Sequence, residues 1–255
     1  MTELRIVLVG ADGHMGAEVI KAAAKQQDLK IVAGISKDDS VSLAFPLYRS
    51  IADVQEAFDL VIDFSNPVLL DDIISSCIKL AKPVVIATTG YNESEEAKIR
   101  ALSEHVAVFK SANMSVGVNL MAHLAQIAAK VLYPDFDIEI VEAHHRRKKD
   151  AASGTALLLA NAIQEALSDQ AELELVYDRS QRNEVRPQDE IGMSVIRGGN
   201  IVGEHEVYFA GNGEVLTLKH SAISREVFAD GALTAAKFIV NQEAGLYNMK
   251  HLFTI

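Results

Sequence analysis

The sequence of 255 residues contains one cysteine, Cys77, and no long apolar run. A single cysteine excludes an internal disulfide and a zinc site built from several thiolates. Isoleucine and leucine neighbours at helical spacing predict that Cys77 is a small core residue. No apolar stretch approaches the roughly 20 residues that a membrane-spanning helix needs, and no charged-then-apolar signal segment opens the sequence. We therefore expect a cytoplasmic protein with no membrane partner.

Positive charge is also scarce, because 24 lysine and arginine residues stand against 35 aspartate and glutamate residues and give a net charge of −11. This balance argues against a general polyanion-binding role, so nucleic acid is not an expected partner. A local basic patch can still attract a small anion. The composition, 49% hydrophobic and 23% charged, is that of a globular protein with one or two domains.

Short apolar strands alternate with helical patterns through the first half of the chain. Residues 4–9 are apolar apart from Arg5, as in a strand buried on both faces of a parallel sheet. Residues 15–25 follow with apolar side chains three and four apart, which predicts an amphipathic helix. Further strands are expected at residues 31–35, 60–64, 84–88 and 106–109, with helices between the later ones. The alternation predicts an α/β fold with a Rossmann-type doubly wound parallel sheet.

The second half of the chain has a different pattern. After a helix at about residues 118–132, residues 138–143 alternate in polarity, as in a less buried strand. Residues 173–177 indicate an edge strand, and the polar residues 178–189 indicate a surface connection. Two glycine-asparagine turns typical of antiparallel hairpins separate three more expected strands, at residues 191–196, 201–209 and 214–220.

These patterns predict a second, α+β domain containing a mixed or antiparallel sheet. A helix is expected between its first two strands, at residues 157–167. The last helix, at about residues 226–240, carries apolar side chains at mostly helical spacing. We expect this helix to pack back on the first domain.

A glycine-rich segment joins the first expected strand to the first expected helix. Gly10 suits a tight turn, Gly13 keeps side chains away from a pyrophosphate, and Gly16 lets helix and strand pack closely. Backbone N–H groups and the helix dipole would then bind the phosphates of a dinucleotide. A plain strand-to-helix turn is the alternative. The segment reads Gly10-Ala11-Asp12-Gly13-His14-Met15-Gly16, a G-x-x-G-x-x-G variant of the dinucleotide fingerprint.

The end of the second expected strand bears on the choice of cofactor. NAD-binding domains place an acidic residue there, where it accepts hydrogen bonds from the ribose hydroxyls. This sequence has Ser36 and Lys37 instead, which together with His14 can host the 2′-phosphate of NADPH. We predict NADPH as the preferred cofactor, with NADH also possible. Replacement of the missing acid by Asp38 or Asp39 is the alternative.

A basic segment follows the strand at residues 138–143. Imidazoles exchange protons near neutral pH and Lys148 carries a positive charge, which suits a substrate that gains negative charge during reaction. Hydroxyl and N–H groups at a helix start can bind a carboxylate. The segment contains His144, His145, Arg146, Arg147, Lys148, Lys149 and Asp150, and the helix start Ser153, Gly154 and Thr155 comes after it. We predict an anion site for a small dicarboxylate.

Two alternative interpretations give the basic segment no binding role: it is a solvated loop followed by an ordinary helix N-cap. A metal site is not expected, because adjacent histidines cannot easily face one ion together. The nearby Glu142 and Asp150 also do not complete a ligand set at a usual spacing. Nucleic-acid binding is disfavoured because the chain lacks an aromatic-basic surface pattern.

These motifs resemble the dihydrodipicolinate reductase family of lysine and diaminopimelate biosynthesis. The resemblance covers nearly the whole chain, and the histidine-lysine segment that ends in Ser-Gly-Thr-Ala is highly specific to the family. Besides the glycine turn, the matching segments are Ile62-Asp63-Phe64-Ser65, Ala87-Thr88-Thr89-Gly90, Ser111-Ala112-Asn113-Met114-Ser115-Val116-Gly117-Val118-Asn119, residues 142–156 and Gly203-Glu204-His205.

The resemblance implies a role for each matching residue. His144 acts as the proton donor and Lys148 assists it, while His145, Lys148, Gly154 and Thr155 hold the substrate's carboxylates. The residues implied to line the cofactor are Ala87, Thr88, Thr89, Ser111, Ala112, Asn113 and Met114.

The resemblance also implies an NAD(P)H-dependent reduction of 4-hydroxy-tetrahydrodipicolinate, by way of dihydrodipicolinate, to tetrahydrodipicolinate. A hydride reaches the unsaturated ring, and a proton must then quench the electron-rich product. A homotetramer assembled by the sheet domain is implied as well. The expected domains are residues 1–114 with 226–255 for the dinucleotide, and residues 115–225 for substrate binding and oligomerisation.

Two departures from the family pattern lie in the basic segment. Ala152 stands where the family usually has proline, and Arg147 stands at a position often filled by histidine. Arg146, Arg147 and Lys149 have no assigned role. Another oxidoreductase acting on a different small dicarboxylate, and a non-catalytic NADP-binding regulator, are the alternative functions.

Overall fold

The apolar run near the start of the chain forms strand β1 (Leu4–Val9) in the computed structural model, which describes residues 3–38, 40 and 42–253. Ile6 and Leu8 pack into one core, and Val7 and Val9 pack into another. Successive side chains of a strand point to opposite faces, so a strand that is apolar throughout needs cover on both faces. β1 therefore lies at the centre of a layered α/β unit.

This unit comprises Met1–Val116 and Arg225–Ile255 and is called unit 1. Its sheet has the strand order β12-β6-β5-β4-β1-β2-β3, and the pairings are parallel. The other strands are β2 (Leu29–Ile35), β3 (Leu47–Tyr48), β4 (Leu60–Asp63), β5 (Val84–Ile86), β6 (Ala107–Lys110) and β12 (Gly245–Tyr247). The predicted Rossmann-type sheet is confirmed.

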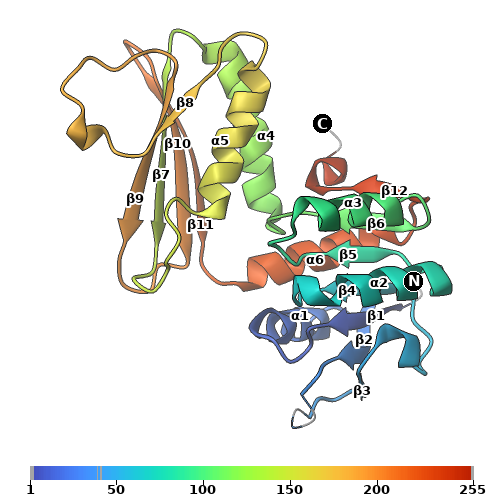
Figure 1. Cartoon of the computed structure of the whole chain (residues 1–255). Coiled ribbons are helices and arrows are strands. Elements are labelled where there is room, and N and C mark those ends of the chain that lie inside the picture. Colours follow the sequence, from blue (N-terminus) through green and yellow to red (C-terminus); the bar gives the residue numbers. More distant parts are fainter. Residues whose placement is uncertain (1–2, 39, 41, 254–255) are drawn as a thin grey trace. The chain divides into compact units, whose positions relative to one another are not determined.

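Helices cover both faces of the unit 1 sheet (Figure 1). One core contains side chains of α1 (His14–Ala24) and α6 (Glu226–Ile239), among them Val19 and Leu233. The other contains side chains of α2 (Leu70–Leu80) and α3 (Glu93–Leu102). Cys77 is fully buried in this second core, as its spacing predicts.

The strand order reverses between β1 and β4, because β2 and β3 extend the sheet on one side and β5 and β6 on the other. Gly10 follows β1, and Phe64 follows β4. Doubly wound sheets bind ligands at the carboxyl ends of the strands beside such a switch point. The topology therefore brings the glycine turn to the place where a ligand is expected.

The second unit, Gly117–Ser224, is called unit 2 and is built on a mixed sheet with the strand order β11-β10-β7-β9-β8. Its helices α4 (Val116–Leu132) and α5 (Gly154–Leu167) lie on one face of the sheet, where their apolar side chains form the core (Figure 1). The strands are β7 (Asp137–His144), β8 (Glu174–Val176), β9 (Glu190–Arg197), β10 (Gly203–Ala210) and β11 (Val215–Ala222). In neither unit does a described helix combine the length and the apolar character needed to cross a membrane.

One of the two predicted hairpins is wrong. The hairpin of β10 and β11 is confirmed, but β9 and β10 are not neighbours because β7 lies between them. β7 pairs with β10 in antiparallel and with β9 in parallel orientation, so that Ile140 lies opposite both Val207 and Met193. Strands lie about 4.8 Å apart, so residues 198–202 are long enough to pass over one intervening strand. A turn signal predicts a reversal of the chain and leaves the pairing partner open.

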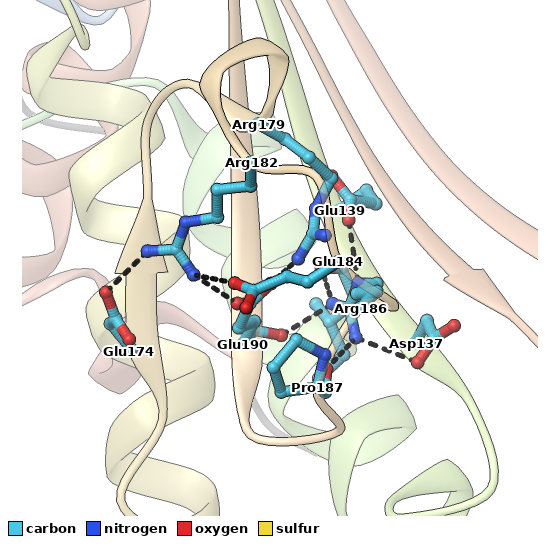
Figure 2. Close-up of polar contacts among 10 residues, drawn as sticks. Asp137, Glu139, Glu174, Arg179, Arg182, Glu184, Arg186, Pro187 and Glu190 are labelled. Atoms are coloured by element: carbon cyan, nitrogen blue, oxygen red, sulfur yellow. Dashed lines mark hydrogen bonds and ion pairs between the residues drawn. The ribbon is translucent and has the colours of Figure 1, made fainter.

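The polar connection between β8 and β9 is exposed in large part, but arginines fasten it to the sheet (Figure 2). Glu190, the first residue of β9, is only 2% exposed and forms ion pairs with Arg179 and Arg182. Arg182 also donates to Glu174 on β8 over 3.0 Å. Two arginines therefore neutralise the buried carboxylate at the start of β9.

Arg186 makes the most extensive contacts of this connection (Figure 2). Its guanidinium donates to the carboxylates of Asp137 and Glu139 over 2.8 and 3.0 Å. It also donates to the main-chain carbonyls of Ile138 and Glu190 over 3.0 and 2.6 Å. The side chain thus joins the start of β7 to the start of β9.

We expect Arg186→Ala to destabilise unit 2 by about 2–3 kcal/mol, because the substitution removes the donor that serves the carboxylates and carbonyls at the starts of β7 and β9. Chemical denaturation monitored by circular dichroism measures the change. Arg147→Ala is the control, because Arg147 is exposed and donates to one side chain, that of Asn200. Equal stabilities of the two variants would show that Arg186 contributes no more than an ordinary surface arginine.

Candidate active site

The glycine turn in unit 1 is held so tightly that side chains do not fit at two of its glycines. Gly10 has a φ of +78°, and a Cβ there would lie 2.5 Å from the Phe64 carbonyl oxygen. A Cβ on Gly16 would lie 2.2 Å from the Gly10 carbonyl oxygen. Both contacts are far too short, so only glycine permits this approach of α1 to the strands.

A cavity of about 350 Å³ lies beside this turn. The turn contributes Gly10, Asp12 and Gly13, and the end of β2 contributes Ser36 and Lys37. The structure therefore brings together five of the residues predicted to bind the cofactor. The rest of the lining consists of Ile35, Arg49, Phe64, Ser65, Asn66, Val68 and Leu69.

Arg49 is a lining residue that the sequence pattern does not reveal. β3 pairs with the end of β2, so that Tyr48 lies opposite Ile35, and this pairing places Arg49 beside Lys37. A guanidinium N–H group of Arg49 donates to the Lys37 carbonyl. Because β3 has only two residues, no periodicity indicates that this strand exists.

The alternative acids after β2 are placed differently. The carboxylate of Asp38 accepts hydrogen bonds from the backbone and side chain of Ser40 over 2.9 and 2.6 Å. The Asp38 backbone N–H donates to the Ser36 hydroxyl over 3.0 Å. Asp38 thus belongs to a local turn, and Asp39 lies outside the described residues.

The other predicted residues of the glycine turn do not line this cavity. His14 lies with Asp12, Gly13 and Arg225 around a separate hollow of about 350 Å³. Ala11 is 2% exposed and belongs to the core that contains α1 and α6, and Met15 packs against that core. Ala11 can therefore reach a ligand through its main chain but not through its side chain, and Met15 is partly buried.

A buried carboxylate organises the carboxyl ends of β4 and β5. Asp63 is fully buried and accepts hydrogen bonds from the Ser65 backbone and hydroxyl over 3.0 and 2.5 Å. The Ser65 N–H also donates to the Thr88 hydroxyl over 2.8 Å, and the Tyr91 hydroxyl lies 3.3 Å from Asp63. Burial raises the pKa of Asp63 against the lowering effect of these hydrogen bonds.

The remaining predicted cofactor residues follow β5 and β6 at the same edge of the sheet. Thr88 is 7% exposed and its hydroxyl is engaged, whereas Thr89 is exposed and Ala87 partly buried. After β6, the Ser111 hydroxyl donates to the Asn113 carbonyl over 2.7 Å. Ala112 is exposed and Met114 is buried in the core.

The cluster of predicted catalytic residues lies in unit 2, at the end of β7. Glu142 and His144 are two residues apart on the strand and therefore share one face. Their side chains are 1% and 10% exposed, and His144 Nδ1 lies 2.5 Å from Glu142 Oε2. Arg197 on β9 donates to both Glu142 oxygens, over 2.8 and 2.7 Å.

Burial and the guanidinium group of Arg197 set the pKa values of Glu142 and His144. Burial acts to raise the pKa of Glu142, but hydrogen bonds from Arg197 and His144 outweigh it and hold that pKa below its usual value. Burial also lowers the pKa of His144; Glu142 opposes this shift, and Lys148 and Arg197 add to it. The resting state is therefore an ionised Glu142 beside a neutral His144 at neutral pH.

The predicted helix start at Ser153 is confirmed, because Ser153 caps α5 and its hydroxyl accepts from the Ala156 N–H over 3.2 Å. The same hydroxyl lies 3.1 Å from His205 Nε2, and the Ser153 N–H donates to Glu142 over 3.1 Å. Both polar groups of Ser153 are thus engaged inside the protein. Gly154 is exposed and Thr155 is half-buried at the first turn of the helix.

The basic segment divides into half-buried and exposed side chains. Lys148 is 20% exposed and its ammonium lies 2.8 Å from the Asp150 carboxylate. His145 is half-buried, and its Nδ1 is a buried atom that has no hydrogen-bond partner within the described part of the chain. The exposed residues of the segment are Arg146, Arg147, Lys149 and Asp150.

His205 on β10 completes the cluster. It is 4% exposed, and its ring meets that of His144 edge to face with 5.1 Å between centroids. Burial lowers the pKa of His205 to about 4, with a further contribution from His144. Glu142 could be found from the sequence, since it lies two residues before His144 on the same strand. His205 stands in the matching segment Gly203-Glu204-His205, whereas Arg197 lies more than 50 residues along the chain and gives no local signal.

A metal ligand set was not expected from the sequence. Within residues 3–38, 40 and 42–253, the structure places no three or more histidine, cysteine, aspartate or glutamate side chains around a common point suited to a metal ion.

Comparison with known proteins gives consistent matches over the full length of both units. Residues 4–114 match the family model "Dihydrodipicolinate reductase, N-terminus", and residues 117–253 match "Dihydrodipicolinate reductase, C-terminus". A 4-hydroxy-tetrahydrodipicolinate reductase of Caldanaerobacter subterraneus subsp. tengcongensis is 47% identical to this chain and covers 98% of both chains. The enzyme of that name from Clostridium tetani is 46% identical and covers 96% of this chain and 95% of its own.

The fold is also similar to that of a solved structure. The dipicolinate-bound dihydrodipicolinate reductase from Paenisporosarcina sp. TG-14 aligns with a TM-score of 0.81. The alignment covers 97% of this chain and 98% of the other, at 22% sequence identity. At that identity, the likeness supports the two-unit fold.

The low pKa of His205 predicts a loss of stability in acid. An unfolded histidine binds a proton near pH 6.5, whereas the folded His205 binds one only near pH 4. The unfolded state therefore holds more protons between these values, and the free energy of unfolding falls by on the order of 3 kcal/mol as the pH drops from 6.5 to 4. In His205→Gln, denaturation at several pH values should show that this part of the pH dependence is lost. Parallel curves for the variant and the wild type would refute this assignment.

Proposed function

The chain belongs to the dihydrodipicolinate reductase family, and we propose that it reduces 4-hydroxy-tetrahydrodipicolinate, by way of dihydrodipicolinate, to tetrahydrodipicolinate with NAD(P)H. The observation that carries this proposal is the buried cluster at the end of β7. There, His144 shares the basic segment with Lys148 and precedes the start of α5. A neutral imidazole, a cation and a helix start form a site for an anion that must receive a proton.

The substrate is a dicarboxylate, and the basic segment offers two kinds of partner for it. Lys148 supplies positive charge, and the half-buried His145 supplies an imidazole. Gly154 and Thr155 stand at the first turn of α5, where backbone N–H groups and the helix dipole favour a carboxylate. Ser153 acts by shaping this turn, because its own hydroxyl and N–H are engaged.

His144 is the proposed proton donor and Lys148 its assistant. When bound, the reduced nicotinamide cofactor supplies a hydride, which leaves the substrate ring electron-rich. Before the substrate binds, burial keeps the pKa of His144 low. Two added carboxylates favour the protonated imidazole, so His144 gains its proton as the substrate arrives. It then delivers that proton to the reduced ring.

Unit 1 fits a dinucleotide cofactor. Gly10 lines the cavity and has no side chain, so its main chain can meet a ligand directly. Lys37 and Arg49 put two cations on the wall of that cavity, while the Asp38 carboxylate is occupied by Ser40. This arrangement supports a preference for NADPH, with NADH also used, because cations attract a 2′-phosphate.

We assign the dinucleotide-binding role to residues 1–114 with 226–255, and the substrate-binding and oligomerisation role to residues 115–225. Exposed apolar side chains support a homotetramer assembled through the unit 2 sheet, because such side chains often mark protein interfaces. A cytoplasmic location accords with a biosynthetic reaction on a small dicarboxylate. The exposed residues concerned are Val195 and Ile196 on β9, and Val215 and Leu216 on β11.

A coupled assay with the synthase that makes the substrate tests the reaction and the role of His144. We expect the wild type to oxidise NADPH only when that synthase is active. His144→Gln should lower kcat roughly 100-fold or more and change KM little, since the proton donor acts in the chemical step. Lys148→Ala should impair both kcat and KM, and Arg147→Ala is the surface control.

Other results of this assay separate the alternatives. Turnover of a different dicarboxylate imine in place of the synthase product would indicate a related oxidoreductase. NADPH binding without turnover of any dicarboxylate would indicate a non-catalytic regulator. Full activity of His144→Gln would remove this residue from the chemistry.

Separate measurement of NADPH and NADH oxidation tests the cofactor preference. We expect kcat/KM to favour NADPH, and Arg49→Gln to reduce kcat/KM for NADPH about tenfold while NADH stays within about twofold. Lys21→Gln is the control, because Lys21 is an exposed cation of unit 1 that pairs with Glu18 on the same helix. A wild-type kcat/KM that favours NADH tenfold would contradict the prediction.

A further inference from the structure

Glu142 has more partners than any other carboxylate around the proposed proton donor. Two N–H groups of Arg197, the Ser153 N–H and His144 Nδ1 all contact its two oxygens within 3.1 Å. Arg197 also donates to the Asp150 carbonyl over 2.7 Å. None of these contacts uses Nε2, the other nitrogen of the His144 ring.

We propose that Glu142, clamped by Arg197, is a positioning residue that fixes the Nδ1–H tautomer of His144 and makes Nε2 the atom that takes up and delivers the proton. The proposal rests on the proposed function of His144 and adds how the ring is oriented. It assigns Glu142 and Arg197 no contact with the substrate.

The donor and acceptor inventory leads to this tautomer. Arg197 can only donate, and two of its five N–H groups point at the Glu142 carboxylate. An ionised carboxylate can only accept, so the 2.5 Å contact requires a hydrogen on His144 Nδ1. A neutral imidazole carries one hydrogen, which leaves Nε2 as its free base.

Nε2 of His144 lies beside a glycine. Gly203 on β10 faces it, and a Cβ on Gly203 would lie 3.1 Å from Nε2. That distance is tighter than an ordinary contact, so any larger residue would press on the nitrogen. The glycine therefore leaves room where a proton must pass.

Sheet register explains why Arg197 meets Glu142 and His144, which lie far from it in the sequence. Glu142 and His144 share a face of β7, and His144 lies opposite Arg197 in the parallel pairing of β7 with β9. The main-chain ladder thus sets the position of the guanidinium, and its two N–H groups fit the carboxylate in a bidentate pair. An arginine-held carboxylate is a rigid acceptor for the histidine.

The charged and titratable groups around His144 come from three strands and one connecting segment. Glu142 lies on β7, Lys148 in the following segment, Arg197 on β9 and His205 on β10. Removing the anion at residue 142 should favour neutral His144, and removing the cation at residue 197 should favour the protonated form. The two substitutions should therefore shift the titration of His144 in opposite directions, which a loss of structure alone would not do.

The test combines kinetics with solid-state NMR of protein labelled with 15N at histidine, in which His144 is assigned from its missing signals in His144→Gln. We expect the wild type to show Nδ1–H at His144, and Glu142→Gln to show a mixture of tautomers. Glu142→Gln should lower kcat about 10- to 100-fold with KM within about threefold. The alkaline limb of the pH profile of kcat should move to lower pH in Glu142→Gln.

Arg197→Gln should move the alkaline limb of the kcat profile to higher pH and lower kcat. Arg197→Lys should restore part of the lost kcat, because lysine keeps the charge but not the bidentate geometry. Glu139→Gln is the matched control. Glu139 lies on the same strand and also pairs with an arginine, Arg186, but it is remote from His144 in the register. We expect the control to leave kcat and the tautomer unchanged.

An Nε2–H tautomer in the wild type would overturn the proposal even if a variant failed to fold. Unchanged tautomer and pH profile in Glu142→Gln would overturn it as well, and the function of His144 would stand. If no dicarboxylate were turned over while Glu142→Gln changed the tautomer, the positioning role would stand and the proposed function would fall.

Discussion

Burial of the Glu142 carboxylate is the constraint on which the architecture of unit 2 depends. An unpaired charge in such a place would cost several kcal/mol, and loss of one partner of a buried pair typically costs about 3–5 kcal/mol. Its partners come from β9, from β7 itself and from the start of α5. Arg197 also donates to the Asp150 carbonyl in the segment after β7. The carboxylate and its arginine therefore hold together the strand, the loop and the helix that carry the proposed anion site.

Unit 1 shows a related device at the carboxyl ends of its strands. Asp63 is buried beside Ser65 and Thr88, and its hydrogen bonds fix the loops that follow β4 and β5. The adjacent turn at Gly10 leaves main-chain groups facing the cavity. In both units a buried carboxylate organises polar groups that a loop alone would leave free to move, and preorganisation of this kind favours binding of a charged ligand.

Much of the candidate site could be predicted because its residues are close in sequence. The glycine turn, Ser36 with Lys37, and the segment from His144 to Thr155 each begin at a strand end or directly after one. Spacing along the chain is then enough to place them at one edge of a sheet. Arg49 and Arg197 could not be predicted in this way, since each reaches its site through a strand pairing.

Local sequence patterns are enough to specify the fold class of the first half, the turn where only glycine fits, and the start of α5 at Ser153, because periodicity, sterics and capping act over a few residues. Tertiary structure alone decided that β7 lies between β9 and β10 and thereby brings Arg197 and His205 to His144. A turn specifies where the chain reverses, whereas the neighbour of a strand depends on which pairing buries the most apolar surface and satisfies the buried charges of the whole sheet.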